Sequence, residues 1–391
     1  MKKIVGLGLF IISLLIGSTS VFGEEKNTNI DENIKLAEDA KSAILIEQDT
    51  GEILFKKNEN EPLPPASMTK VMTLLLIMEA IDNEKIKLDE KVTVSERAAS
   101  MGGSQVFLEA GEEMTVEDLL KSIAVASAND ASVTLAERIA GTEEAFVKMM
   151  NDKANELGLK NTRFQNSSGL PARDHYSTSY DMAIIAKELL KYESITDYTS
   201  IYEDYLRKGE ENEFWLVNTN KLVRFYPGVD GLKTGFTNEA KYCLTATAKK
   251  EDMRVIAVVM GAETVKERNA TISGMLDYAF NHFDTKKLYD KNEPVSNLKL
   301  LKAEREHINV VTSNSISYIH KKGYEPENIT TVIQLDDHIK LPLKKGDQVG
   351  ILQVKNENEV VSETALVVEK DINEATYYTL LKRSIKNIVK K

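Results

Sequence analysis

Cysteine is almost absent from this sequence, because Cys243 is the only one among 391 residues. A single thiol excludes an intramolecular disulfide, which fits an exported chain that avoids disulfides altogether. Histidine is also scarce, with five in the chain, and no spaced set of His, Cys and Asp residues is typical of metal ligands. We therefore expect neither a metal site nor a cofactor.

The chain also lacks an excess of positive charge. Its 50 basic and 61 acidic residues leave a formal net charge of −11. A general nucleic-acid binder would be basic, so we expect no nucleic-acid partner. The hydrophobic content of 42% suffices for buried cores, and the length favours two or three domains.

The N-terminus has the pattern of an export signal. Lys2 and Lys3 precede an apolar stretch at 4–16, so residues 1–23 predict a signal peptide. The competing interpretation is an uncleaved membrane anchor, although the apolar stretch is shorter than a typical span. The polar segment 24–38 predicts a linker.

Residues 39–290 predict a first large domain of the α+β class. Two apolar runs around Asp49-Thr50-Gly51 predict a β-hairpin, and several helical segments follow. Three strand candidates, beginning at Leu232, Lys241 and Arg254, then come in close succession, which predicts an antiparallel meander. A helix from about Val265 to Phe283 would cover one face. The hairpin and meander would form one antiparallel sheet flanked by helices, with a helical subdomain inserted between its segments.

Two further segments follow this domain. Short β-type runs separated by turn residues predict a small all-β domain at 291–372, without catalytic residues. In the tail, 373–391, apolar residues fall at helical spacing with basic residues between them. A basic amphipathic helix is typical of binding to a membrane surface, here through residues 374–391. The competing interpretation is a solvated helix packed on its own domain.

A serine and a lysine stand three residues apart in Ser67-Met68-Thr69-Lys70, ahead of a long apolar run. A helix beginning near Ser67 would place both side chains on one face. The serine needs a base to become a nucleophile, and the lysine must lose its proton to be that base. The pattern is weak evidence alone, since Ser296-Asn297-Leu298-Lys299 repeats it in the all-β region.

Two further motifs strengthen the first. Ser127-Ala128-Asn129 falls at a predicted break between helices, and Lys233-Thr234-Gly235 on a predicted strand. The three motifs in this order are the signature of penicillin-recognising serine acyltransferases. Taken singly, Ser127 and Asn129 are ordinary helix caps and Lys233 an ordinary solvated lysine.

The second and third motifs offer side chains that could activate Ser67 and Lys70. Lys70 is the predicted base for Ser67, and the charge of Lys233 would keep Lys70 neutral. Ser127 would relay a proton to the leaving group, and Asn129 would bind a peptide carbonyl or help to hold Lys70. These five residues are the predicted catalytic set.

Substrate binding is assigned to the strand that carries Lys233. Thr234 would donate its hydroxyl to a substrate carboxylate, and Gly235 would leave the strand edge open to a substrate backbone. The N–H groups of Ser67 and Phe236 would form the oxyanion hole. Thr237 completes this predicted binding segment.

On these motifs and on the order of its segments, the sequence resembles the D-alanyl-D-alanine carboxypeptidases, the low-molecular-mass penicillin-binding proteins. The resemblance implies a penicillin-binding/β-lactamase-like transpeptidase fold and an acyl-Ser67 intermediate. It implies a peptidoglycan stem peptide ending in D-Ala-D-Ala as substrate, β-lactams as acylating agents, and Arg268 as a holder of the terminal carboxylate. It also implies a site of action in the cell wall, at the outer face of the cytoplasmic membrane.

Three alternatives remain at this point. A β-lactamase of the same fold uses an additional glutamate, for which the sequence has no clear counterpart, and lacks the β domain and tail. A D,D-endopeptidase shares the three motifs. A catalytically silent wall-binding protein would not need the intact set of motif residues. The sequence also has Ala128 and Phe236 where some family members have glycine and histidine.

Overall fold

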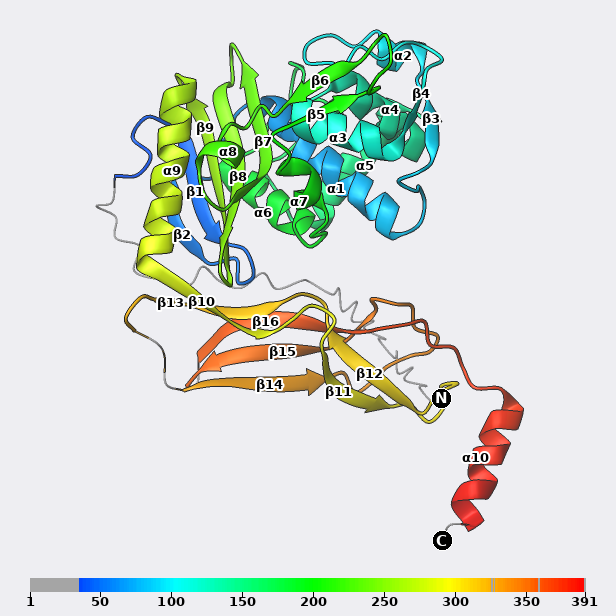
Figure 1. Cartoon of the computed structure of the whole chain (residues 1–391). Helices are drawn as coiled ribbons and strands as arrows, with labels where there is room; N and C mark the ends of the chain where they lie inside the picture. The colour runs from blue at the N-terminus through cyan, green and yellow to red at the C-terminus, as the bar shows by residue number, and fades with distance from the viewer. Residues whose placement is uncertain (1–34, 325, 327, 358, 390–391) are drawn as a thin grey trace, which may run out of the picture.

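The computed structural model describes residues 35–324, 326, 328–357 and 359–389. The predicted signal peptide and most of the predicted linker lie outside these residues. The described chain forms a mixed α+β unit, then an all-β unit, and ends in a helix that projects from the second unit (Figure 1).

The first unit is built on a five-stranded antiparallel sheet in the order β2-β1-β9-β8-β7. The predicted hairpin does join the predicted meander, because β1 pairs with both β2 and β9. Strand β7 lies at the edge of this sheet. The bounds are β1 Ser42–Glu47, β2 Ile53–Lys57, β7 Val229–Thr237, β8 Lys241–Lys250 and β9 Met253–Ala262.

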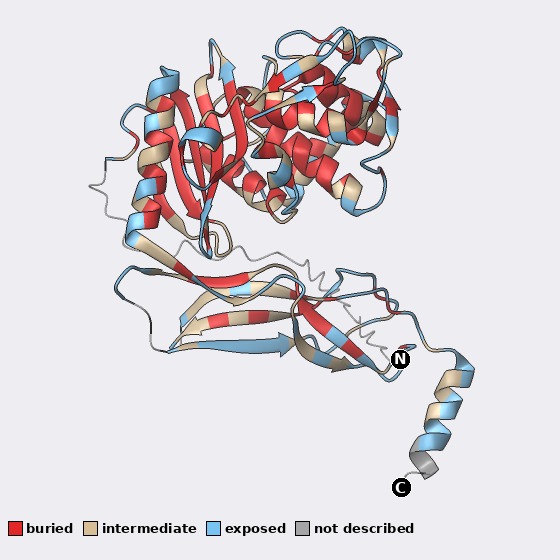
Figure 2. Cartoon of the chain, viewed as in Figure 1, coloured by how far each residue is buried: buried red, intermediate tan, exposed pale blue. Residues whose placement is uncertain are grey.

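Each face of this sheet has its own core. Along β1, Ile44 and Ile46 belong to one core and Ala43 and Leu45 to the other, as strand alternation requires. Helices α8 and α9 pack on the second core. Helices α2 to α7 pack on the first core around α1, which is buried along most of its length (Figure 2). The helices are α1 Lys70–Asp82, α2 Glu96–Ala99, α3 Val116–Ala126, α4 Asn129–Ala140, α5 Glu143–Glu156, α6 Ser179–Leu189, α7 Ile195–Thr199, α8 Leu222–Phe225 and α9 Val265–His282.

Two small antiparallel strand pairs flank the helices of this unit. They pair β3 Lys91–Thr93 with β4 Glu113–Thr115, and β5 Glu203–Leu206 with β6 Phe214–Val217. The β5–β6 hairpin is absent from our sequence-based prediction because each strand has only four residues. Such short strands carry little periodic signal.

The second unit confirms the predicted all-β domain. Its main sheet has the order β11-β12-β16-β15-β14, and a second ladder pairs β10 with β13. The bounds are β10 Phe283–Tyr289, β11 Pro294–Lys299, β12 His307–Thr312, β13 Ile316–Lys321, β14 Ile329–Leu335, β15 Gln348–Asn356 and β16 Glu359–Val368. We expected the boundary after residue 290, whereas β10 already pairs with this unit.

Candidate active site

Ser67 lies on a tight turn rather than within a regular α-helix. Residues Ala66–Thr69 form a 3₁₀ turn that runs directly into α1. Ala66 has a φ of 47°, a left-handed conformation that is uncommon for a residue with a side chain. The Met68 amide donates to the Pro65 carbonyl at 3.1 Å and closes the turn. Ser67 is thereby half-buried at the mouth of α1, as its spacing from Lys70 predicted.

Lys70 is fully buried and donates to three oxygen atoms. Its Nζ lies 2.6 Å from Asn129 Oδ1, 2.6 Å from the Ser168 carbonyl oxygen and 3.4 Å from Ser67 Oγ. Burial, and then the charge of Lys233, lowers the pKa of Lys70 well below its usual range, while Asp130 opposes this shift. A lysine in this state can accept a proton from the serine beside it.

The second motif sits where α3 ends and α4 begins. Ser127 has a φ of 64° and is almost fully buried, so the chain turns sharply between the two helices. Helix α4 starts at Asn129. Asn129 Nδ2 donates to the Gly102 carbonyl at 2.7 Å, which orients its Oδ1 toward Lys70. Of the two roles predicted for Asn129, this geometry supports holding Lys70.

Asp130, which follows the motif, is an anchor for a neighbouring loop. Its carboxylate accepts the amides of Val106 and Leu108 at 3.0 and 3.1 Å, and the amide of Ala131 in its own helix at 2.9 Å. These contacts stabilise the start of α4. They also fix the loop that supplies Gly102 to Asn129.

Two further basic side chains lie at the site. They are Lys233 of the third motif and Arg268 of helix α9. Lys233 on β7 is buried and donates from Nζ to the Thr234 carbonyl at 3.0 Å. Burial, and then the charge of Arg268, lowers the pKa of Lys233 to about 7. Arg268, near the start of α9, is 4% exposed and donates to Asn269 Oδ1 at 2.9 and 3.1 Å. This accumulation of buried positive charge suits an anionic group of a ligand.

The sequence analysis did not predict two contacts at the site, one to a side chain and one to a backbone carbonyl. Thr219 Oγ1 accepts from Thr234 Oγ1 at 2.8 Å, and the Ser168 carbonyl accepts from Lys70. Asn218-Thr219-Asn220 is a polar run that could have drawn attention. Ser168 contributes only its carbonyl, which every residue type has, so its identity carried no signal.

Two glycines permit the close packing around Ser67. A Cβ on Gly235 would lie 2.7 Å from the Pro65 carbonyl oxygen and 3.2 Å from Met68. A Cβ on Gly169 would lie 1.9 Å from the Ala66 carbonyl oxygen and 2.9 Å from the Ser67 nitrogen. We predicted that Gly235 opens the strand edge to a substrate, and its immediate structural role is to let β7 approach the Ser67 turn.

The last two predicted binding residues lie at the end of β7. The Phe236 ring is half exposed and lies against Tyr242, with ring centroids 4.4 Å apart. Thr237 Oγ1 accepts the Ala240 amide at 3.0 Å and so holds the turn between β7 and β8. Strand β7 lies at the edge of its sheet, where an extended ligand could pair with it. Binding of a substrate backbone there stays a prediction.

His175 is a structural residue of this region. Its Nε2 lies 2.8 Å from Thr69 Oγ1, and its ring packs edge-on against Phe164. Burial lowers the pKa of His175 to about 4, so the imidazole stays neutral at physiological pH. Within the described part of the chain, no group of three or more His, Cys, Asp or Glu residues could hold a metal ion.

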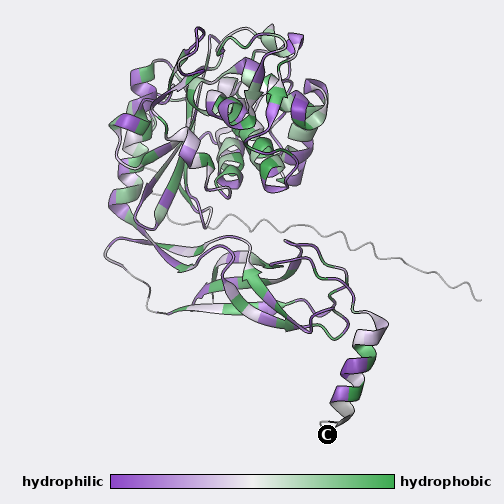
Figure 3. Cartoon of the chain, turned by 45° about the vertical axis from the view of Figure 1, so that its right-hand side comes forward, coloured by the Kyte–Doolittle hydropathy of each residue, from purple (hydrophilic) through white to green (hydrophobic). Residues whose placement is uncertain are grey.

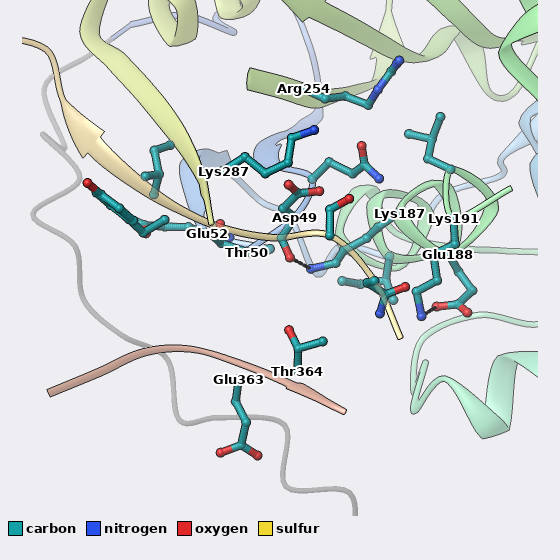
Figure 4. A pocket seen from close by; sticks show the side chains of 18 of the residues that line it. Asp49, Thr50, Glu52, Lys187, Glu188, Lys191, Arg254, Lys287, Glu363 and Thr364 are labelled. Carbon is teal, nitrogen blue, oxygen red and sulfur yellow. Dashed lines mark hydrogen bonds and ion pairs between the residues drawn. The ribbon is translucent and has the colours of Figure 1, made fainter. Parts of the chain in front are cut away.

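A separate cleft of about 1470 Å³ lies between the two units (Figure 4). Asp49, Lys187 and Arg254 line it from the first unit, and Glu363 and Thr364 from the second. Its lining includes none of the predicted site residues. Ser317 Oγ donates to Asp49 Oδ2 at 2.5 Å and joins the two units beside this cleft.

Comparisons with known proteins match both units. Residues 27–264 match the D-alanyl-D-alanine carboxypeptidase family, and residues 283–374 match the C-terminal domain of penicillin-binding protein 5. The chain is 54% identical over 385 residues to the D-alanyl-D-alanine carboxypeptidase DacF of Bacillus subtilis, covering 98% of each chain.

Solved structures agree with this match. Penicillin-binding protein 5 of Haemophilus influenzae has 30% identity and a TM-score of 0.66, over 86% of this chain and 98% of that one. Penicillin-binding protein D2 of Listeria monocytogenes, solved with ampicillin bound, has 32% identity and a TM-score of 0.55. That match covers 63% of this chain and all of the Listeria chain.

Proposed function

The chain belongs to the D-alanyl-D-alanine carboxypeptidase family, a family of serine hydrolases, and on that basis we propose how its residues divide the reaction. The observation that carries the proposal is the position of Lys70, buried with a lowered pKa and 3.4 Å from Ser67 Oγ. The substrate is a peptidoglycan stem peptide ending in D-Ala-D-Ala.

Acylation begins at Ser67. Its Oγ attacks the carbonyl carbon of the last peptide bond while its proton passes to the neutral Nζ of Lys70. The amides of Ser67 and Phe236 stabilise the oxyanion. The C–N bond then breaks, and the proton reaches the leaving amine through Ser127, so that D-alanine departs. Water next attacks the acyl-Ser67 ester and releases the shortened peptide.

The carboxylate of the terminal D-alanine selects the end of a peptide chain. We assign its binding to Thr234 and Arg268, with Lys233 adding positive charge. Lys233 and Arg268 are both buried, and their charges favour an anion because little water remains to screen them. The β-lactam antibiotics carry a comparable carboxylate and a reactive carbonyl, so they acylate Ser67 by the same route.

The experiment that tests this function measures two products. Incubation with a D-Ala-D-Ala stem peptide releases one D-alanine for each peptide, and labelled penicillin attaches at Ser67. D-Alanine release without cutting of crosslinked dimers supports the carboxypeptidase. Cutting of dimers alone identifies an endopeptidase, the activity named for a Pseudomonas aeruginosa relative that is 31% identical over 224 residues.

The two lysines predict a bell-shaped dependence of acylation on pH. The rate rises as pH passes the lowered pKa of Lys70, since only the neutral amine accepts a proton. It falls as pH rises through the pKa of Lys233, about 7 in the free enzyme, because the charge of Lys233 is then lost. Arg268→Ala removes a repelling charge, so the alkaline limb of kcat/KM moves to higher pH.

The pH at which kcat/KM falls on the alkaline side is the quantity to compare between the variants. The maximum value of kcat/KM is not compared, because Arg268→Ala also lowers it by removing a residue assigned to the substrate carboxylate. The control is Arg224→Ala, which removes an exposed arginine on α8 and leaves both limbs in place. An alkaline limb that stays fixed in Arg268→Ala contradicts the proposed coupling between Arg268 and Lys233.

We also propose that the tail binds a membrane surface from outside. Helix α10, Tyr377–Val389, leaves Tyr377, Leu381 and Ile385 exposed, and polar and apolar residues alternate along it (Figure 3). Arg383, in the middle of the helix, donates to the carbonyls of Leu301, Ala303 and Glu304, so the helix is tied to the all-β unit. Among the described residues, none of the helices is long and apolar enough to cross a membrane.

Charging the apolar side of α10 should release the protein from membranes. We expect Leu381→Glu with Ile385→Glu to lower sedimentation with anionic phospholipid vesicles at least tenfold, because both side chains would otherwise enter the lipid interface. Deleting residues 374–391 should have the same effect. Ser384→Glu, on the same helix, is the control and should reduce binding only slightly. Sedimentation of the deletion variant at the wild-type level would contradict the proposal.

A further inference from the structure

Exposed aromatic side chains gather on the β5–β6 hairpin. Tyr205 and Trp215 are direct cross-strand partners and are 42% and 55% exposed. Their neighbours Leu206 and Leu216 are buried in the helical core. One face of the hairpin therefore packs on the protein, and the other displays two large rings side by side. Trp215 is the only tryptophan of the chain.

An ion pair fixes the orientation of this hairpin. Asp204 Oδ2 lies 2.9 Å from Lys121 Nζ on α3. Asp204 lies on the packed face, one residue before Tyr205, so this contact holds the aromatic face outward. The hairpin lies beside α3 and close to β7 in the assembled unit (Figure 1).

The hairpin leads directly into the active site. Strand β6 ends at Val217, and two residues later the chain reaches Thr219, whose hydroxyl accepts from Thr234. Trp215 is four residues before Thr219, which corresponds to about 13 Å of extended chain. The exposed rings are thus anchored within a short distance of the residues assigned to the substrate carboxylate.

A third exposed ring is held in place by the same hairpin. Phe107 is 62% exposed and contacts Phe214 edge-on, with ring centroids 5.8 Å apart. Its φ of 57° is unfavourable for a bulky residue. Arg207, at the end of β5, pairs with Glu112 at 2.6 Å and donates to the carbonyls of Val106 and Phe107. Phe214 shares the packed face of β6 with Leu216, so Phe107 lies on that side of the hairpin. We call Tyr205 and Trp215, on the other face, the aromatic rim.

Rigid aromatic rings facing water are suited to a ligand that covers them. The C–H faces of pyranose rings stack on such rings, while the Tyr hydroxyl and the Trp N–H can bond to sugar oxygens. The substrate of the proposed function is a peptide joined to a glycan strand. About four extended residues span the distance from Thr219 to Trp215. A glycan attached to a peptide bound at Ser67 therefore comes within reach of the rim.

We propose that the aromatic rim binds the glycan strand that carries the stem peptide. This inference rests on the proposed function, because it assigns a second part of the same substrate to the same site. The rim makes the enzyme prefer peptides that are still attached to sugar over free peptides.

Trp215 reports binding directly through its fluorescence. Titration of the full protein with a soluble tetramer of N-acetylglucosamine should change the emission of Trp215 in a saturable manner. No change with the sugar overturns the proposal. A change with anionic phospholipid vesicles and none with the sugar also overturns it, and identifies the rim as a lipid-facing surface.

A kinetic comparison tests the role of the rim in the reaction. We expect Trp215→Ala and Tyr205→Ala each to lower the ratio of kcat/KM on a disaccharide-linked stem peptide to that on the free peptide at least fivefold. Tyr324→Ala removes a ring that is 70% exposed on the second unit, and should leave the ratio unchanged. A ratio equal to wild type in both rim variants overturns the proposal, whatever their absolute rates.

The two proposals fail in different ways. If wild-type enzyme releases no D-alanine from the free peptide, the proposed function fails, and the fluorescence titration still decides whether the rim binds sugar. If the free peptide is cleaved and the sugar leaves Trp215 unaffected, only the rim proposal fails.

Discussion

Ser67→Ala should abolish both penicillin labelling and D-alanine release, lowering kcat by a factor on the order of 10⁴ or more. The variant removes the only atom that bonds to the acyl group in the proposed reaction. The side chain is half-buried and small, and its loss leaves the turn Ala66–Thr69 with all its backbone contacts. The effect on the free energy of unfolding should therefore be small. Mass spectrometry of the penicillin adduct and an assay for free D-alanine measure the two losses.

The second Ser-x-x-Lys of the chain provides the matched control. Ser296 and Lys299 lie on β11 in the all-β unit, where the strand places them outside the catalytic cluster. Ser296→Ala should retain wild-type labelling and turnover. A penicillin adduct that persists in Ser67→Ala would refute the assignment of the nucleophile, and an adduct lost from Ser296→Ala would refute the assignment of the motif.

Gly169→Ala should lower acylation by a factor on the order of 10² to 10³ and destabilise the fold. The added Cβ would lie 1.9 Å from the Ala66 carbonyl oxygen, so the backbone that positions Ser67 must move. A shift of this size at a nucleophile disturbs the alignment that the reaction requires. The φ of +84° at Gly169 adds strain of about 1–2 kcal/mol for any residue with a side chain. Thermal unfolding and the rate of penicillin labelling measure the two effects.

Gly141→Ala separates the steric effect from the backbone strain. Gly141 has a φ of +86°, and a Cβ there meets no atom within 4 Å. This control should therefore lower the melting temperature through strain alone and leave labelling unchanged. Equal labelling rates in the two variants would show that Gly169 does not position Ser67.

The sequence determined the chemical groups and their local arrangement. The spacing of Ser67 and Lys70 is local, so one helical turn suffices to bring them together. The apolar run after Lys70 predicted that the lysine begins a buried helix, and α1 is buried along most of its length. The order of the three motifs, and the close succession of strand candidates around the third, likewise indicated the fold class of the first unit.

Tertiary structure alone decided how these groups are held. Lys70 is oriented by the Ser168 carbonyl and by Asn129, which lie 98 and 59 residues away in the chain. Every residue type has a backbone carbonyl, so the sequence could not mark Ser168 as a partner of Lys70. Gly169 is needed because the Ala66 carbonyl, from a residue distant in sequence, lies where a Cβ would be. Strand pairing likewise assigned β10 to the second unit. Local periodicity cannot encode these contacts, because each depends on where a distant segment packs.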